Sequence, residues 1–202
     1  FRHPDAKHTG EPGMALSTHL SNHKLYLLGM LCAILAWGMA CIELGANTHL
    51  WFSGLSEQGY LQAWSDEMPR LASDGFVLSW SSRALLMLLD YLPTLLSAFG
   101  LALTGLFFRR LAKGERWSQR NARTLVHIGL LSFLALLLQP FINTLQGLVL
   151  SLDLPDGERV LSVSIGLTSE AAYEFLKAIF LCSFGLMMSE ARKLDEEVRA
   201  FI

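Results

Sequence analysis

Four long runs of apolar residues alternate with polar connectors along this chain. The runs cover about residues 25–44, 83–108, 124–150 and 169–188. A helix needs about 20 residues to cross the hydrocarbon core of a bilayer, and each run reaches that length. The pattern therefore predicts an all-α membrane protein, with four transmembrane helices in a bundle that forms a single domain from residue 23 to residue 202.

The region before the first run, residues 1–22, is polar. We expect a disordered tail here, with residues 1–13 lying upstream of a native start at Met14. Its histidines are irregularly spaced and indicate no metal site. The first run has no charge before Glu43 and continues into Trp51 and Phe52, so it is predicted to be a retained span rather than a cleaved signal peptide.

The connector after the first run, residues 45–82, is polar but rich in aromatic residues. Within it, apolar residues recur at helical spacing, and these are Leu61, Trp64, Met68 and Leu71. The spacing predicts a short amphipathic helix that lies on the membrane surface and places its indoles among the headgroups.

The last connector and the end of the chain predict two further elements. Residues 160–168, VLSVSIGLT, alternate apolar with small or polar residues, which is compatible with a brief strand. The fourth helix is expected to continue to the end of the chain. One face of this extension carries Ala191, Leu194, Val198 and Phe201. Two ion pairs at i,i+4 spacing are expected along it, Arg192–Glu196 and Lys193–Glu197.

Charge is unevenly distributed among the connectors. The connector between the second and third spans holds six of the sixteen Lys and Arg residues, with Glu115 as its single acid, whereas residues 45–82 hold four acids and one Arg. Residues 153–168 hold three acids and one Arg. Short loops rich in Lys and Arg stay in the cytoplasm. Both termini are therefore expected in the cytoplasm and both acidic connectors outside.

This orientation places polar residues of all four spans at similar depths in the outer half of the membrane. The candidate intramembrane polar site comprises Asp90, Gln139, Asn143, Gln146, Glu174 and Lys177, with Glu43 closing the first span. Lys177 is the one cation at this depth, and its counter-ion is expected to be Asp90 or Glu174. Two interpretations stay open: an outward-opening ligand, ion or proton site, or hydrogen bonds between helices that stabilise the bundle.

Composition agrees with the membrane assignment and offers little catalytic chemistry. The chain is 52% hydrophobic and only 17% charged, against about 25% charged residues in soluble domains. Its three cysteines lie inside apolar runs and form no disulfide or metal spacing. Motifs such as HExxH, GxSxG and a phosphate-binding glycine loop are missing. We therefore expect no enzyme activity, no catalytic residues, no cofactor, no metal and no nucleic-acid partner.

A motif in the basic connector resembles a known signature. Residues 113–121, KGERWSQRN, are followed by Leu125, Ile128 and Gly129. This resembles the KGExFSxxNxxxLxxIG signature of a bacterial four-span inner-membrane family catalogued only as a domain of unknown function, with Trp117 in place of Phe. The resemblance covers about residues 83–202 and implies a regulatory or accessory membrane protein. Physically, Gly114 is expected to turn the chain, Ser118 to cap the next helix, and Asn121 to hydrogen-bond the connector or the C-terminal helix.

Three functions remain under consideration. The leading one is a non-enzymatic integral membrane protein that contacts another protein, or a second copy, in or beside the bilayer. Its candidate cytoplasmic docking or lipid-headgroup site comprises Arg109, Arg110, Lys113, Arg116, Trp117, Arg120, Asn121 and Arg123, whose cations anionic headgroups could equally neutralise. The second is immunity against a membrane-inserting toxin. The third is a small-solute or proton-linked transporter or membrane enzyme that uses Asp90, Glu174 and Lys177, although no inverted repeat is evident.

Overall fold

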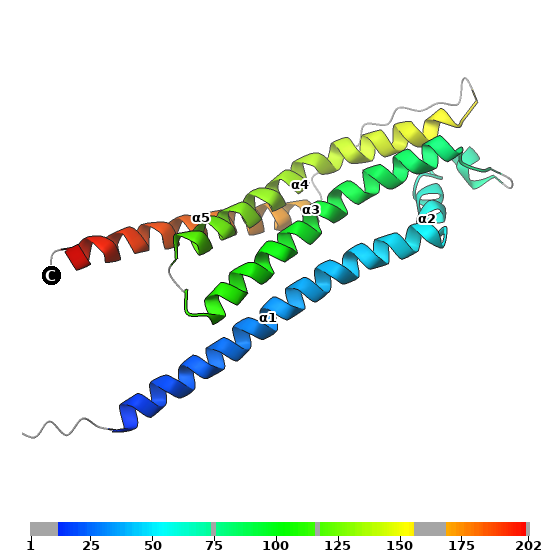
Figure 1. Ribbon diagram of the computed structural model, residues 1–202. Helices are drawn as coiled ribbons and strands as arrows, with labels where there is room; N and C mark the ends of the chain where they lie inside the picture. Colours follow the sequence, from blue (N-terminus) through cyan, green and yellow to red (C-terminus); the bar gives the residue numbers. More distant parts are fainter. Residues whose placement is uncertain (1–11, 74–75, 116–117, 156–168, 201–202) are drawn as a thin grey trace, which may run out of the picture.

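The computed structural model describes residues 12–73, 76–115, 118–155 and 169–200. Throughout these ranges the regular structure is helical, without strands (Figure 1). The elements in chain order are α1 (Pro12–Phe52), α2 (Leu55–Ala63), η1 (Pro69–Ala72), α3 (Trp80–Ala112), α4 (Gln119–Leu152) and α5 (Ser169–Ala200). The four longest helices, α1, α3, α4 and α5, are each long and apolar enough to cross a membrane. The predicted multi-pass helical bundle is therefore confirmed.

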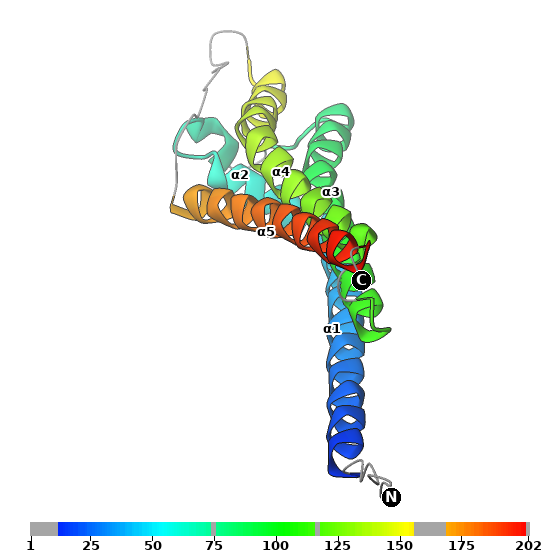
Figure 2. The same ribbon diagram turned by 90° about the vertical axis from the view of Figure 1, so that its left-hand side faces the viewer.

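The long helices follow one another in a row. α1 packs along α3, α3 along α4, and α4 along α5 (Figure 1). Among the described residues, extensive packing between long helices is confined to these neighbours, so α1 and α5 form the two edges (Figure 2). We call this arrangement the helix row. Its consequence is that each edge helix keeps a broad side free of contacts from the other long helices.

The first helix is longer at both ends than its hydropathy predicts. It begins at Pro12, within the region predicted as a polar tail, and proline suits the first turn of a helix. It also runs past residue 44 to Phe52, because the polar residues of its last turns bond to α3 instead of water. Residues 1–11 and the strand expected at residues 160–168 lie outside the described residues.

The aromatic connector folds back onto the helix row as a cap, which we define as α2, η1 and residues 76–79. The expected helix exists, but α2 ends at Ala63, so the apolar stripe does not lie on one helix. Nor does the stripe lie against the membrane surface as expected. Met68 and Leu71 are buried, and the ring of Trp64 lies so close to Gly147 of α4 that a Cβ there would meet it at 2.6 Å. The hydrophobic core beneath the cap comprises Trp51, Met68, Leu71, Leu78, Leu86, Val149, Leu150 and Leu154.

Small residues allow close approach where α4 meets α5. A Cβ on Gly129 would lie 2.5 Å from Sγ of Cys182 and 2.9 Å from the backbone oxygen of Ala178. A Cβ on Gly185 would lie 2.8 Å from Val126. Transmembrane helices depend on such contacts, because lipid is as apolar as their side chains and offers no hydrophobic driving force for association.

These contacts also determine where α5 lies along α4. The rings of Phe175 and Phe133 are 6.0 Å apart, and Gly185 packs beside Ala122 near the beginning of α4. α5 is thus shifted toward the basic connector, and its residues after Met188 project beyond the first turn of α4 (Figure 1). The predicted extension of the fourth helix is confirmed as far as Ala200.

The projecting end contains one of the two expected ion pairs. Nε of Arg192 lies 2.6 Å from Oε1 of Glu196, as predicted. Nζ of Lys193 instead lies 2.7 Å from Oε1 of Glu190, one turn back, so the predicted contact with Glu197 is wrong. Both glutamates are within one turn of Lys193, and its ammonium group contacts the earlier one.

Candidate functional site

Asp90 lies where the end of α1, the cap, α3 and α4 meet. Its carboxylate accepts a hydrogen bond of 2.7 Å from Nε1 of Trp51 and one of 2.6 Å from the hydroxyl of Tyr60. Nε2 of Gln146, on α4, donates to the same hydroxyl oxygen at 3.0 Å. We call these four residues the Asp90 cluster. The carboxylate thus joins α1, α2 and α3 directly, and Tyr60 extends the connection to α4. Hydrogen bonds to a charged group are among the stronger ones in proteins.

The local sequence explains how Tyr60 reaches Asp90. Gly54 has φ of +79°, a conformation that side chains disfavour, and it turns the chain sharply between α1 and α2. α2 therefore folds back beside the last turn of α1. The rings of Trp51 and Tyr60 stack at a centroid distance of 5.9 Å, which directs both donors toward α3.

The environment keeps Tyr60 protonated. Burial raises the pKa of the Tyr60 hydroxyl well above its usual value of 10.0, and the hydrogen bond and charge of Asp90 raise it further. The bond from Gln146 opposes this rise. Because burial disfavours the phenolate and Asp90 needs a donor, Tyr60 serves as a hydrogen-bond donor rather than as a base.

A polar seam continues from Asp90 along the contact between α1 and α3, and the sequence interpretation missed it. It comprises three further hydrogen bonds: Thr48 with Tyr91 at 2.6 Å, Asn47 to Thr94 at 2.9 Å, and Ser97 to Glu43 at 3.1 Å. The available signal was the i, i+4, i+7 spacing of Asp90, Thr94 and Ser97. These bonds satisfy polar groups that the apolar run would otherwise expose to lipid.

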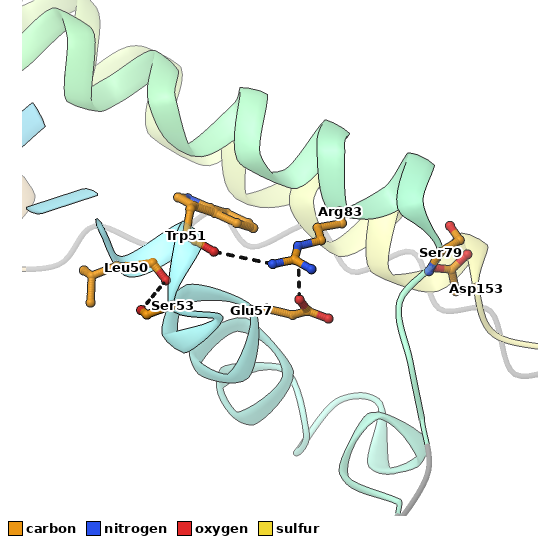
Figure 3. Close-up of polar contacts among 7 residues, drawn as sticks. All are labelled: Leu50, Trp51, Ser53, Glu57, Ser79, Arg83 and Asp153. Atoms are coloured by element: carbon orange, nitrogen blue, oxygen red, sulfur yellow. Dashed lines mark hydrogen bonds and ion pairs between the residues drawn. The ribbon is translucent and has the colours of Figure 1, made fainter. Parts of the chain in front are cut away.

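A second contact, beside the cluster, attaches the cap to α3. Figure 3 shows the guanidinium of Arg83 between two oxygens, with Nε 3.3 Å from Oε2 of Glu57 and Nη2 3.4 Å from the backbone oxygen of Trp51. Nearby, Oδ2 of Asp153 accepts from the backbone N–H of Ser79 at 2.8 Å. Arg83 is partly exposed, so this ion pair adds little stability by itself.

The remaining members of the predicted polar layer lie elsewhere. Gln139 donates to Asn143 at 3.1 Å, and both belong to α4. Lys177 pairs with Glu174 on α5, so its counter-ion is Glu174 and not Asp90. This pair lies near the level of Phe133. Phe133 comes thirteen residues before Gln146 on α4, so at 1.5 Å per residue the pair lies about 20 Å from the level of Gln146. The structure brings together Asp90 and Gln146 but leaves the other four residues in separate pairs.

The basic connector has the expected turn and cap. Gly114 has φ of +89°, and the side chain of Ser118 accepts from the backbone N–H of Asn121 at 3.2 Å. Nδ2 of Asn121 donates to the backbone oxygen of Glu115, one of its two expected partners. Asn121 is fully buried. It therefore shapes the connector from inside and does not belong to a docking surface as predicted.

The cations of this connector have different roles. Nη1 of Arg110 donates to Oγ1 of Thr124 at 3.0 Å and joins α3 to α4, while the guanidinium of Arg109 lies 6.0 Å from the ring of Trp37 on α1. Lys113, Arg120 and Arg123 are exposed. Arg116 and Trp117 lie outside the described residues. The described, exposed residues of the proposed docking site are thus fewer than the eight that were predicted.

Comparisons of the chain with known proteins give no match. No protein-family model, curated protein or solved structure matches it. Within the ranges that the structure describes, no three His, Cys, Asp or Glu side chains are grouped in a way that would hold a metal ion.

Proposed function

We propose that this protein is a non-enzymatic component of the bacterial cytoplasmic membrane that acts through contacts between its own helices and another protein. The observation that supports this most directly is the Glu174–Lys177 ion pair on the edge helix α5. Each side chain is 44% exposed, and the only long helix packed against α5 among the described residues is α4. An ion pair on this open edge is more easily understood beneath a second protein than beneath lipid.

The proposed orientation places the ion pair at a depth where exposure is costly. With the basic connector at the cytoplasmic surface, Phe133 lies nine residues beyond Thr124, about 13 Å into a hydrocarbon layer of about 30 Å. An ionised side chain there costs at least about 2.5–3.5 kcal/mol. Contact with another protein would remove Glu174 and Lys177 from lipid.

The same orientation places Asp90 close to the outer headgroups. Asp90 and Arg109 are nineteen residues apart on α3, which corresponds to about 28 Å, nearly the full hydrocarbon thickness. Together with its donors Trp51 and Tyr60, this supports the interpretation of the Asp90 cluster as the attachment of the cap to the helix row. Transport or enzyme chemistry is therefore the less favoured proposal.

We assign to the exposed cations of the basic connector a contact with lipid headgroups. Lys113, Arg120 and Arg123 would lie at the cytoplasmic surface, where each basic residue gains about 1 kcal/mol from anionic lipid.

In-cell photo-crosslinking tests the proposal. A photoreactive amino acid replaces the exposed Leu176 on α5, next to the ion pair, and in a matched variant the exposed Leu130 on α4. Leu130 lies at a similar depth, since Gly129 packs beside Ala178. We expect a protein adduct at position 176 and lipid adducts at position 130. Lipid adducts alone at both positions would refute the proposed function.

A further inference from the structure

The free side of α5 carries apolar residues in a regular pattern over four heptads, interrupted by Lys177. Tyr173, Phe180, Met187 and Leu194 recur every seven residues, and a second series recurs four residues after each of them: Lys177, Phe184, Ala191 and Val198. Alternating steps of four and three residues are the spacing of the a and d positions in a coiled coil, which face a partner helix. We call these eight residues the α5 seam.

The α5 seam points away from the other helices that the structure describes. α5 contacts α4 through Ala178, Cys182, Gly185 and Met188, which occupy other positions of the heptad. Tyr173, Phe180, Met187 and Leu194 are exposed by 70, 66, 67 and 62%. Large apolar side chains at every d position are therefore available to a partner.

Beyond Met188 the α5 seam leaves the apolar part of the helix. The residues around it there include charged ones, of which Glu190 and Lys193 are exposed. Leu194 and Val198 nevertheless remain exposed by 62 and 59%. This stripe lies on the same side of one continuous helix as the intramembrane part of the seam. It therefore faces sideways rather than toward the headgroups, which makes the membrane surface a poor cover for it.

The charges beside the α5 seam indicate which kind of helix could pack on it. In this register Glu190 and Glu197 occupy the g positions of the projecting end, and the sequence places Asp195 at an e position. Residues at e and g meet their counterparts across a helix pair. A second copy of α5 would bring acid against acid, whereas a helix with Lys or Arg at these positions would be attracted. Lys177, at an a position and paired with Glu174, would fix the register.

We propose that the α5 seam binds a helix of a second protein that runs alongside α5 within the membrane and past its cytoplasmic surface. This helix has apolar residues at a and d and basic residues at e and g. The inference rests on the proposed function and names the chemistry of the partner at the same edge.

The test uses the full chain in a neutral detergent and two synthetic helical peptides. Both peptides have leucine at a and d, and they differ in having lysine or glutamate at e and g. Binding is followed by fluorescence anisotropy of the labelled peptide. The lysine peptide is expected to bind and the glutamate peptide to bind at least about tenfold more weakly, because its charges match those of Glu190 and Glu197.

Two variants of the projecting end make the test specific. Leu194→Glu places a charge in the seam and is expected to weaken binding of the lysine peptide by about tenfold or more. Glu197→Lys is expected to shift the preference toward the glutamate peptide. Its matched control is Glu196→Lys, the same change at an f position outside the seam, which is expected to leave the preference as it is.

Three results would overturn this inference. They are absence of lysine-peptide binding, equal binding of both peptides, and a chain dimer trapped by a disulfide in Leu194→Cys. A protein adduct at position 176 together with any of these results would leave the proposed function in place and reject only the basic-flanked partner. Lipid adducts alone at position 176 would reject the proposed function itself.

Discussion

Asp90 is the polar side chain that joins the cap to the helix row. It accepts from Trp51 and Tyr60, and Tyr60 in turn accepts from Gln146. Trp51 also belongs to the hydrophobic core beneath the cap, and Tyr60 packs against that core. Removing the carboxylate would therefore leave two donors without an acceptor in a well-packed region.

We expect Asp90→Ala to reduce the stability of the folded protein substantially. A buried group that loses its hydrogen-bond partner costs about 1–3 kcal/mol, and two donors lose theirs here. Thermal unfolding in detergent measures the effect. Asp90→Asn keeps an acceptor oxygen and should lose less stability. Asp66→Asn, at an exposed position between α2 and η1, should unfold as the wild type does. A wild-type unfolding temperature for Asp90→Ala would show that the cluster does not hold the cap.

At the scale of helices, contacts between glycine and backbone decide how α4 and α5 pair. Gly129 allows α4 to approach the backbone of Ala178 and Cys182, while Gly185 allows α5 to approach Ala122 and Val126. These contacts lie within two turns of one another. They therefore set both the separation of the two helices and the position of α5 along α4.

Gly129→Ala is expected to weaken this helix pair. The added methyl would lie 2.9 Å from a backbone oxygen and 3.0 Å from a backbone nitrogen, neither of which can rotate away, and overpacking costs about 1–3 kcal/mol. Gly100→Ala on α3 is the matched control, since its methyl would meet nothing within 4 Å. The thermal unfolding temperature should fall for Gly129→Ala and stay unchanged for Gly100→Ala. Equal behaviour of the two variants would contradict a role for close approach.

At the scale of the whole molecule, the helix row and the charge of its connectors define an orientation. Arg109 and Arg110 end α3 beside the beginning of α4, and Glu57 and Asp153 lie at the opposite end. Cations are translocated poorly in short loops. The end of the row that carries the basic connector is therefore expected in the cytoplasm, together with the C-terminal end of α5.

A topology reporter measures this orientation. Fused after Ile202, a reporter that is active only in the cytoplasm is expected to be active, whereas the same reporter inserted after Asp66 is expected to be silent. Replacing Lys113, Arg120 and Arg123 with glutamine should reduce the preference for this orientation, because it removes half of the connector's cations. A reporter that is active after Asp66 and silent after Ile202 would show that the protein has the opposite orientation.

Much of the fold follows from local patterns. The apolar runs specify four helices because each run needs only its own length and composition to be stable in lipid. The turn at Gly114 and the cap at Ser118 also follow from single residues. Within the candidate site, Asp90 and Gln146 meet through Tyr60, and Lys177 pairs with Glu174, one of its two expected counter-ions.

What the sequence determined by itself is thus the number of spans, the basic turn and the charge asymmetry, all of which depend on residues near one another in the chain. The tertiary structure decided which polar residues meet. Trp51 and Tyr60 reach Asp90 because Gly54 turns α2 back onto the helix row, and Lys177 lies far from Asp90 because packing at Gly129 shifts α5 along α4. Depth inferred from span ends cannot include such a shift, since it arises only when two helices pack together.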